Sequence, residues 1–307
     1  MSASTPPFAR LRTGQVVPMQ SIFAILRKMT SDVPVKFTEK GMVIYALDDR
    51  EICIAHIEIS AEEIGQCGTY ECPKPCVAGV SVSDMQSALQ SAKPNDMLTI
   101  ELVRDPAVER VLRVWITNDR GTACFYDVNV LDMDEEIMQF PKTNDEYTIV
   151  SMQSVVVQRR CKSALSVRDA QVCVLYCTPE NLIIQTVNDM GKVSVNVPID
   201  AGRMSPTQNQ DIVDSPYSMR FISLALRAYK ITRSISFKIC PGHPLVLEYK
   251  VPFLGALRMF IAPEPQTLSE NQKKQHLDMI RVRQGGDLPA ADEDRIKQTI
   301  QRHMTKK

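Results

Sequence analysis

The chain lacks the short motifs that many enzymes use to bind phosphate or to present a nucleophile. It contains no G-x-S-x-G elbow, no G-x-x-x-x-G-K-[ST] phosphate loop and no G-x-G-x-x-G dinucleotide motif. Histidine, the commonest general base, occurs only four times, and His276 and His303 lie near the C-terminal end. We therefore expect no enzymatic activity, no catalytic residue and no cofactor.

Long hydrophobic runs are also missing from the 307 residues. A membrane-spanning helix needs roughly 18 consecutive apolar residues, and no segment supplies them. The first twelve residues, MSASTPPFARLR, contain neither an apolar core nor a small-residue cleavage pattern, so no secretory signal is expected. These features predict a protein that works inside a cell and has no membrane partner.

Nine cysteines are scattered mostly through apolar, strand-like runs, which favours reduced and buried thiols over a disulfide framework. Cys67, Cys72 and Cys76 could form a zinc site, but the tight pairwise spacing and a fourth ligand are missing. Cys161 lies between two basic residues that would favour its thiolate, yet it falls on the apolar face of its predicted helix. A thiol- or zinc-dependent enzyme is therefore an alternative from another functional class, and no bound metal is expected.

Net charge is zero, but the charges are unevenly distributed along the chain. Residues 265–307 contain nine Lys or Arg and six Asp or Glu, so this tail carries +3 and residues 1–264 carry −3. The tail also contains a polar run and the pair Gly285-Gly286. We expect residues 265–307 to form a basic tail that is flexible or partly helical.

The body of the chain contains an internal repeat. Residues 20–47 are predicted to form a helix, a strand, a turn and a second strand, and residues 153–187 repeat this plan about 140 positions later. Predicted helices at 83–92 and 217–230 are each followed by two further strands. The sequence therefore predicts an α+β fold of two similar domains, residues 1–130 and 143–264, each with two helices packed on antiparallel sheets. An acidic connecting loop is expected at 131–142.

Three of the four predicted helices have one apolar face and one basic face without carboxylates. The basic positions are Arg27 on the first helix, Arg159 and Lys162 on the helix near residue 160, and Arg220, Arg227 and Lys230 on the last helix. The helix after Val82 instead exposes uncharged Ser83, Ser87 and Gln90. Lys and Arg at this loose spacing can neutralise phosphates without reading base edges. The alternative is an ordinary solvated helix face.

A hairpin near the C-terminal end of the body is predicted from two strands, 244–251 and 257–263, with a turn at Gly255. Alternation would bury Leu245, Leu247, Tyr249 and Val251 and place Glu248 and Lys250 on a solvated face. Pro263 cannot continue a strand ladder, so Phe260 and Ile261 are predicted at a sheet margin that a partner could reach. An ordinary core hairpin is the alternative.

Several segments between residues 8 and 264 are informative when taken in their order and spacing. They are Phe8-Ala9-Arg10-Leu11, Leu47-Asp48-Asp49 after Gly41, Val80-Ser81-Val82-Ser83-Asp84-Met85, Val130-Leu131-Asp132-Met133-Asp134-Glu135, Pro141, Pro244 to Val251, and Gly255 with Ala262-Pro263. On these segments, residues 8–264 resemble the proliferating cell nuclear antigen family of DNA sliding clamps.

The resemblance implies a head-to-tail homotrimeric ring whose helices line a hole around duplex DNA, and hence a DNA polymerase processivity factor. The basic positions above would face the hole. Implied partners are double-stranded DNA without sequence preference, DNA polymerases and other proteins with clamp-binding peptides, and a clamp loader. The implied docking pocket consists of Leu47, Ile52, Met138, Phe140, Pro141, Pro244, Phe260, Ile261, Ala262 and Pro263.

The sequence departs from the family pattern in its neutral overall charge, in Ser87 and Gln90, and in the tail after residue 264. These departures suit a distant eukaryote or a large DNA virus, so the expected location is the nucleus or a cytoplasmic site of viral replication. A subunit of a heterotrimeric checkpoint clamp is a second hypothesis within the same fold. Retention of the docking residues favours the homotrimer.

Overall fold

The computed structural model describes residues 6–133, 147–165, 172–178, 180–188, 191–199, 212–240 and 243–263. Its first half contains, in chain order, β1 (Ala9–Thr13), α1 (Val16–Leu26), β2 (Asp32–Thr38), β3 (Gly41–Leu47), β4 (Cys53–Ser60), α2 (Ala61–Ile64), β5 (Thr69–Glu71), β6 (Cys76–Ser81), α3 (Val82–Gln90), β7 (Met97–Asp105), β8 (Glu109–Thr117) and β9 (Ala123–Leu131). The second half contains β10 (Thr148–Gln153), α4 (Ser154–Leu165), β11 (Val172–Cys177), β12 (Asn181–Asn188), β13 (Gly191–Pro198), β14 (Ile212–Ser218), α5 (Met219–Leu226), the 3₁₀ helix η1 (Arg227–Lys230), β15 (Ser234–Ile239), β16 (Leu245–Val251) and β17 (Gly255–Ile261).

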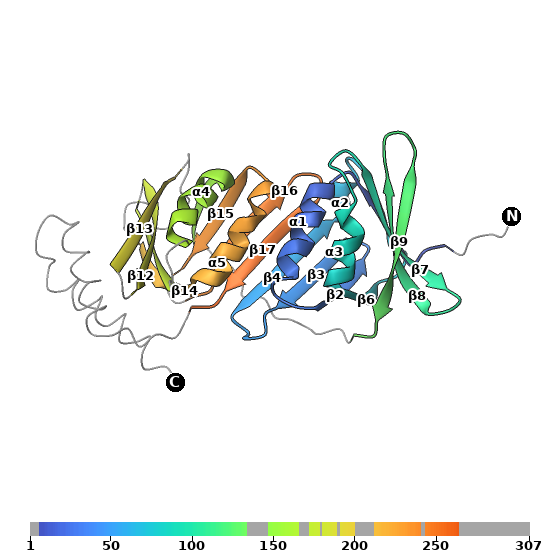
Figure 1. Ribbon diagram of the computed structural model, residues 1–307, viewed down its shortest axis with the longest axis horizontal. Helices are drawn as coiled ribbons and strands as arrows, with labels where there is room; N and C mark the ends of the chain where they lie inside the picture. Colours follow the sequence, from blue (N-terminus) through green and yellow to red (C-terminus); the bar gives the residue numbers. More distant parts are fainter. Residues whose placement is uncertain are drawn as a thin grey trace, which may run out of the picture.

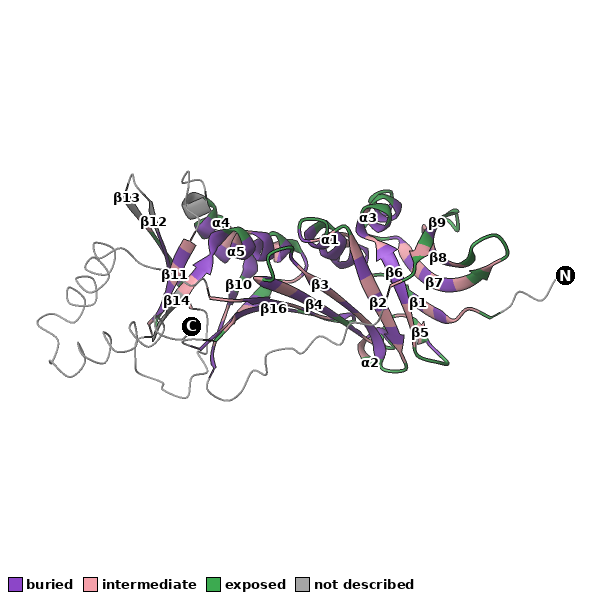
Figure 2. Cartoon of the chain, turned by 90° about the horizontal axis from the view of Figure 1, so that it is seen from below, coloured by how far each residue is buried: buried purple, intermediate pink, exposed green. Residues whose placement is uncertain are grey.

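Helices α1, α3, α4 and α5 lie on one side of an antiparallel sheet system (Figures 1 and 2). Thirteen strands follow the order β10-β15-β16-β17-β4-β3-β2-β6-β9-β8-β7-β1-β5, and four more form a separate sheet in the order β13-β12-β11-β14. None of the described helices is long and apolar enough to cross a membrane. The predicted α+β class is confirmed.

The two halves repeat each other in cross-strand register as well as in element order. Ile100 faces Val114 across β7 and β8, and Phe237 faces Leu247 across β15 and β16. Ser81 and Ser218 precede α3 and α5 with nearly identical backbone angles, φ −65° and ψ 119° against φ −64° and ψ 118°. The predicted domain limits of 130 and 143 stay a prediction, because residues 134–146 lie outside the described part of the chain.

Apolar periodicity explains which helix faces are buried. On α1, Met19, Ile22, Phe23 and Leu26 are at most 2% exposed, and on α3 the side chains of Met85, Ala88 and Leu89 are equally buried. Helix boundaries differ from the prediction at the last helix, because Tyr217 belongs to β14 and the segment after Leu226 is a 3₁₀ turn. The register of the buried face is nevertheless the predicted one.

Strand β17 joins the two halves by pairing with β4 over its whole length, from Gly255 opposite Ile59 to Ile261 opposite Cys53. Gly255 is the first residue of β17 and not the turn itself, which residues 252–254 make. It has φ +144°, and a Cβ there would collide with the carbonyl oxygen of Glu58. Glycine is therefore required by the close approach of β4.

Glu248 is buried rather than solvated, which corrects the predicted outer face of β16. It is 4% exposed, and it accepts a hydrogen bond from Arg258 Nε at 2.7 Å and makes an ion pair with Lys238 Nζ at 3.0 Å. Arg258 also donates to Glu58 on β4 at 2.8 Å, so it links three strands across the junction of the two halves. Two cations compensate the buried carboxylate, which alternation alone could not reveal.

Replacing Arg258 with methionine is expected to destabilise the chain by about 2–3 kcal/mol at neutral pH, because Glu248 loses its strongest hydrogen-bond donor while staying buried. Burial alone would raise the pKa of Glu248, but hydrogen bonds from Arg258 and Lys238 outweigh it and hold the pKa below its ordinary 4.5. This contribution is full above about pH 4.5 and is lost as pH falls through the lowered folded-state value. Urea unfolding at neutral and acidic pH measures both effects.

The matched control is Arg120→Met, at an exposed turn position where only the backbone N–H makes a hydrogen bond to Asn118. The stabilising role of the cluster would be refuted if Arg258→Met lost no more stability than this control at neutral pH.

Candidate nucleic-acid interface and docking surface

The basic side chains predicted on the helices lie on their exposed faces. On α4, Val157 and Cys161 are fully buried, and Arg159 projects from the opposite side of the helix. On α5 and η1, Arg220 and Arg227 are exposed seven residues apart, which is about 10 Å along a helix axis. Lys162, Lys230 and Arg27 are exposed as well. Because these helices lie on one side of the sheets (Figure 2), their exposed cations belong to the helix-covered side of the molecule.

Nothing on these helices offsets the cations. The sequences of α4, α5 and η1 contain no Asp or Glu, and within the described part of the chain none of their Lys or Arg makes an ion pair. Arg160 is a further exposed cation on α4 that the sequence reasoning left out. Its position beside Arg159, on a helix whose buried side is fixed by Val157 and Cys161, was the signal that could have found it. Uncompensated cations of this kind attract phosphates.

On the first half, the predicted outer-face residue Arg27 and the nearby Gln20 both bind to α3. Arg27 donates to Gln86 Oε1 at 2.8 Å. The Gln20 amide is half-buried and donates to the carbonyl oxygens of Leu89 and Ala92 at 2.8 and 2.9 Å. Gln20 therefore caps the last turn of α3, where carbonyls have no partner within the helix.

Several of the predicted docking residues come together beside the β4–β17 junction. Leu47 ends β3, and Ile52 lies in the following turn, which Asp48 shapes by accepting hydrogen bonds from the backbone N–H of Ile52 and Cys53 at 2.7 and 2.6 Å. Ala262 N–H donates to the Ile52 carbonyl at 2.8 Å, so the end of β17 lies along this turn. Leu47, Ile52, Ala262 and Pro263 are all half-buried and accessible.

Phe260 and Ile261 are not the exposed sheet margin that the sequence predicted. Ile261 is fully buried in the main core, and Phe260 is 6% exposed in a small outer cluster with Tyr147, Cys240 and Val246. Tyr147 belongs to this cluster and donates to the Pro244 carbonyl at 3.3 Å, a contact that sequence reasoning missed. Tyr147 lies 113 positions from Phe260 in the chain, so only the fold could reveal that the two share a cluster. Met138, Phe140 and Pro141 lie outside the described residues.

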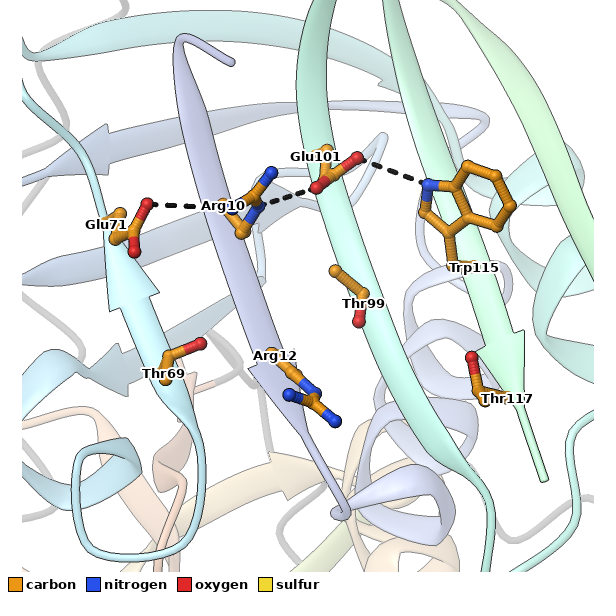
Figure 3. A pocket seen from close by; sticks show the side chains of 8 residues that line it. All are labelled: Arg10, Arg12, Thr69, Glu71, Thr99, Glu101, Trp115 and Thr117. Atoms are coloured by element: carbon orange, nitrogen blue, oxygen red, sulfur yellow. Dashed lines mark hydrogen bonds and ion pairs between the residues drawn. The ribbon is translucent and has the colours of Figure 1, made fainter. Parts of the chain in front are cut away.

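A shallow groove of about 330 Å³ lies on the face of the first half formed by β5, β1, β7 and β8 (Figure 3). Arg10 lies between Glu71 and Glu101, with the closer ion pair to Glu101 at 2.6 Å, and the Trp115 indole donates to the same carboxylate at 3.2 Å. Arg12 and three threonines complete the lining. The eight lining residues include no histidine and no cysteine, and so no pair of a nucleophile with a histidine base.

The thiol and zinc alternatives gain no support from the geometry. Burial raises the pKa of Cys161 to about 12, so the thiolate that a nucleophile needs is disfavoured. Burial and the neighbouring Cys72 raise the pKa of Cys76 to about 11. Among the described residues, no three His, Cys, Asp or Glu side chains are grouped closely enough to hold a metal ion.

Two of the strands whose edges no described strand fully covers are β9 and β13. β9 pairs with β8, and with β6 only at Val130 and Leu131, which leaves its other edge open from Ala123 to Asn129. Phe125 and Tyr126 on this strand are 52% and 38% exposed. β13 pairs only with β12. Open edges with exposed aromatic residues are suited to pairing with another chain.

Comparison with known protein families gives a match, over residues 8–138, to the N-terminal domain of proliferating cell nuclear antigen. The matched range runs from the residue before β1 to the segment after β9, and so includes α1, α3 and the open edge of β9.

Proposed function

Because the chain belongs to the proliferating cell nuclear antigen family of sliding clamps and has the clamp fold, we propose that it is a processivity factor that encloses duplex DNA as a homotrimeric ring. The observation that carries this proposal is the row of uncompensated cations on α4, α5 and η1, all on the helix-covered side. A ring cannot leave DNA sideways, so weak phosphate contacts without base recognition suffice and allow sliding. In this role the protein is a scaffold without catalytic residues.

The internal repeat supports a specific way for copies to join. Leu247 of β16 corresponds to Val114 of β8, so the next strand β17 corresponds to β9, with Leu257 in the place of Cys124. The hairpin of β3 and β4 corresponds to the hairpin of β12 and β13. Ser60 faces Gly41 in the first, and Pro198 faces Asn181 in the second, so β4 corresponds to β13. β17 and β4 pair within one chain, whereas their counterparts β9 and β13 each keep an open edge. Pairing β9 of one copy with β13 of the next would repeat the internal junction.

The correspondence also sets the register of this junction. Leu257 faces Ile57 and Met259 faces Ala55 within the chain, so Cys124 would face Val195 and Tyr126 would face Val193 of the next copy. Such an interface joins two different surfaces, so repeated copies close into a ring or extend into a filament. Light scattering on the purified chain tests the assembly: three subunits are expected, and a monomer at micromolar concentration contradicts the homotrimer. A trimer that forms only with other clamp subunits would favour the checkpoint-clamp alternative.

We propose that replication proteins, including a DNA polymerase, dock a short peptide on the accessible surface formed by Leu47, Ile52, Ala262 and Pro263, beside Pro244 and the Phe260 cluster. Apolar side chains at a strand end can anchor an aromatic residue while the backbone of Ala262–Pro263 guides the peptide. The clamp loader would open and close the ring at the β9–β13 junction.

Replacing Leu47 and Ile52 together by alanine is expected to weaken the binding of a labelled peptide with an aromatic anchor by about tenfold or more, because two apolar walls of the pocket are lost. Fluorescence anisotropy measures the affinity. The matched control is Val108→Ala, at an apolar side chain that is 52% exposed in the β7–β8 turn, away from this surface. Equal binding by the double variant and the wild type would place the docking surface elsewhere.

A further inference from the structure

The two halves of the chain differ sharply in the charge of their helices. α1, with the sequence VVPMQSIFAIL, contains no charged residue, and the only charged residue of α3 is Asp84. The helices of the second half contain no acid, and their cations are Arg159, Arg160 and Lys162 on α4, Arg220 on α5, and Arg227 and Lys230 on η1.

The difference is located at equivalent positions of the repeat. Val82 begins α3 and Met219 begins α5, each after a serine with nearly the same backbone angles. Counting from these residues, Ser83 occupies the place of Arg220 and Gln90 the place of Arg227. All four residues are exposed, so α3 and α5 expose equivalent faces. The two faces differ in charge at these positions, which are uncharged on α3 and positive on α5 and η1.

The cations that follow the helices of the first half do not give these helices the positive charge that the helices of the second half have. Arg27 is the C-cap residue after α1 and donates one guanidinium N–H to the neutral amide of Gln86 on α3, so it keeps its charge. Lys28 and Lys93 are exposed but lie beyond the last turns of α1 and α3. The first half therefore presents hydroxyl and amide groups with one cation, Arg27, and one carboxylate, Asp84, which together attract phosphate far less than a face of six cations.

We infer that duplex DNA in the ring is held by the helices of the second half alone, α4, α5 and η1, and that Arg160 belongs to this contact surface while α1 and α3 act as a neutral spacer. This inference rests on the proposed function. In a ring of three copies, the phosphate contacts form three separate cationic patches divided by neutral arcs, instead of a continuous basic lining.

The test is the salt dependence of binding to a short labelled blunt-ended duplex, followed by anisotropy between about 50 and 200 mM salt. The slope of log K against log salt is negative, and its magnitude, called the slope below, falls by about 0.9 for each lost phosphate contact. Arg220→Ser with Arg227→Gln, which installs the residues of α3 in α5, is expected to lower the slope by at least about 1 and the affinity at low salt by about tenfold or more. Arg160→Gln is expected to lower the slope as well.

The matched control neutralises two cations of the first half, Lys28→Gln with Lys93→Gln, and is expected to leave the slope unchanged. An equal fall of the slope in this control would overturn the inference. Adding Ser83→Arg with Gln90→Arg to the Arg220→Ser, Arg227→Gln chain is expected to restore the slope, because the equivalent positions face the same hole. Failure to restore it would contradict the equivalence on which the inference rests.

The outcomes separate this inference from the proposed function. If the wild-type chain binds no duplex at low salt, or does not assemble, the proposed function fails. If the wild type assembles and binds but its slope depends on Lys28 and Lys93, only the confinement to the second half fails. Light scattering and melting temperature of each variant establish that it assembles and folds before its slope is compared.

Discussion

A chain with Val195→Cys is expected to form covalent dimers and trimers under mild oxidation, through the native Cys124 of the next copy. Residues directly opposite on antiparallel strands have Cβ atoms about 4.5–5.5 Å apart, close to the separation that a disulfide spans, so a small strand movement suffices. Cys124 is exposed on the open edge of β9, and Val195 lies on the edge strand β13. Non-reducing gel electrophoresis would show the covalent species, and reduction would remove them.

Two matched variants make this experiment specific to the proposed register. Cys124→Ser in the Val195→Cys chain should abolish the covalent trimer, which excludes cross-linking through the other cysteines. Val193→Cys places the new thiol two positions away, opposite Tyr126, and should cross-link far less. Cross-linking through Val193→Cys instead of Val195→Cys would mean a register shifted by two residues. No cross-link from either variant would place the contact between copies elsewhere.

Reversing two charges on α4, Arg159→Glu with Lys162→Glu, is expected to abolish the stimulation of a DNA polymerase on long templates without unfolding the protein. Both side chains are exposed, so the change costs no buried interaction. It places two carboxylates where the phosphates of the duplex would lie, which replaces attraction by repulsion within the hole. Product length in a primer-extension assay measures the effect, and circular dichroism checks the fold.

The matched control carries the same change of charge away from the helices, Arg12→Glu with Arg120→Glu. Arg12 lies in the groove on the sheet face and Arg120 in an exposed turn. This variant should support polymerase stimulation close to that of the wild type. Undiminished product length with the α4 variant would refute the assignment of the helix face to DNA.

The same correspondence between the halves explains why docking is expected on only one of them. Val246 faces Phe260 across β16 and β17, and the equivalent positions of β8 and β9 are Arg113 and Asp127. Val246 and Phe260 form the apolar outer cluster, whereas Arg113 donates two hydrogen bonds to Asp127, at 2.7 and 2.8 Å. An ion pair at this place offers no apolar pocket for an aromatic anchor.

Side-chain periodicity was sufficient to predict the class of fold and the faces of the helices. The buried residues of α1, α3, α4 and α5 follow a spacing of three and four, and the exposed cations follow from it, because a helix fixes the direction of each side chain relative to its neighbours. The spacing of Arg220 and Arg227 from the apolar residues of the same segment is therefore enough to assign both to an outer face.

What lies across the sheet from a given residue could not be read in the same way, because strand partners come from distant parts of the chain. Glu248 looked solvated by alternation, but Arg258 and Lys238 from neighbouring strands bury it as a compensated charge. Phe260 and Ile261 looked like an exposed margin, but Phe260 is buried in a small cluster with Tyr147, and Ile261 is buried in the main core. Burial of a strand residue depends on which neighbouring strands and covering elements pack against it, and the local sequence pattern does not contain this information.

The sequence by itself determined the duplicated α+β plan, the absence of familiar catalytic motifs and the basic helix faces, since these depend on composition and local spacing. Only the tertiary structure decided that β17 joins β4 across the two halves and that the equivalent strands β9 and β13 keep open edges. The physical reason is that a strand ladder satisfies backbone hydrogen bonds of segments about 200 residues apart in sequence, so pairing and free edges become visible only when the whole chain is folded.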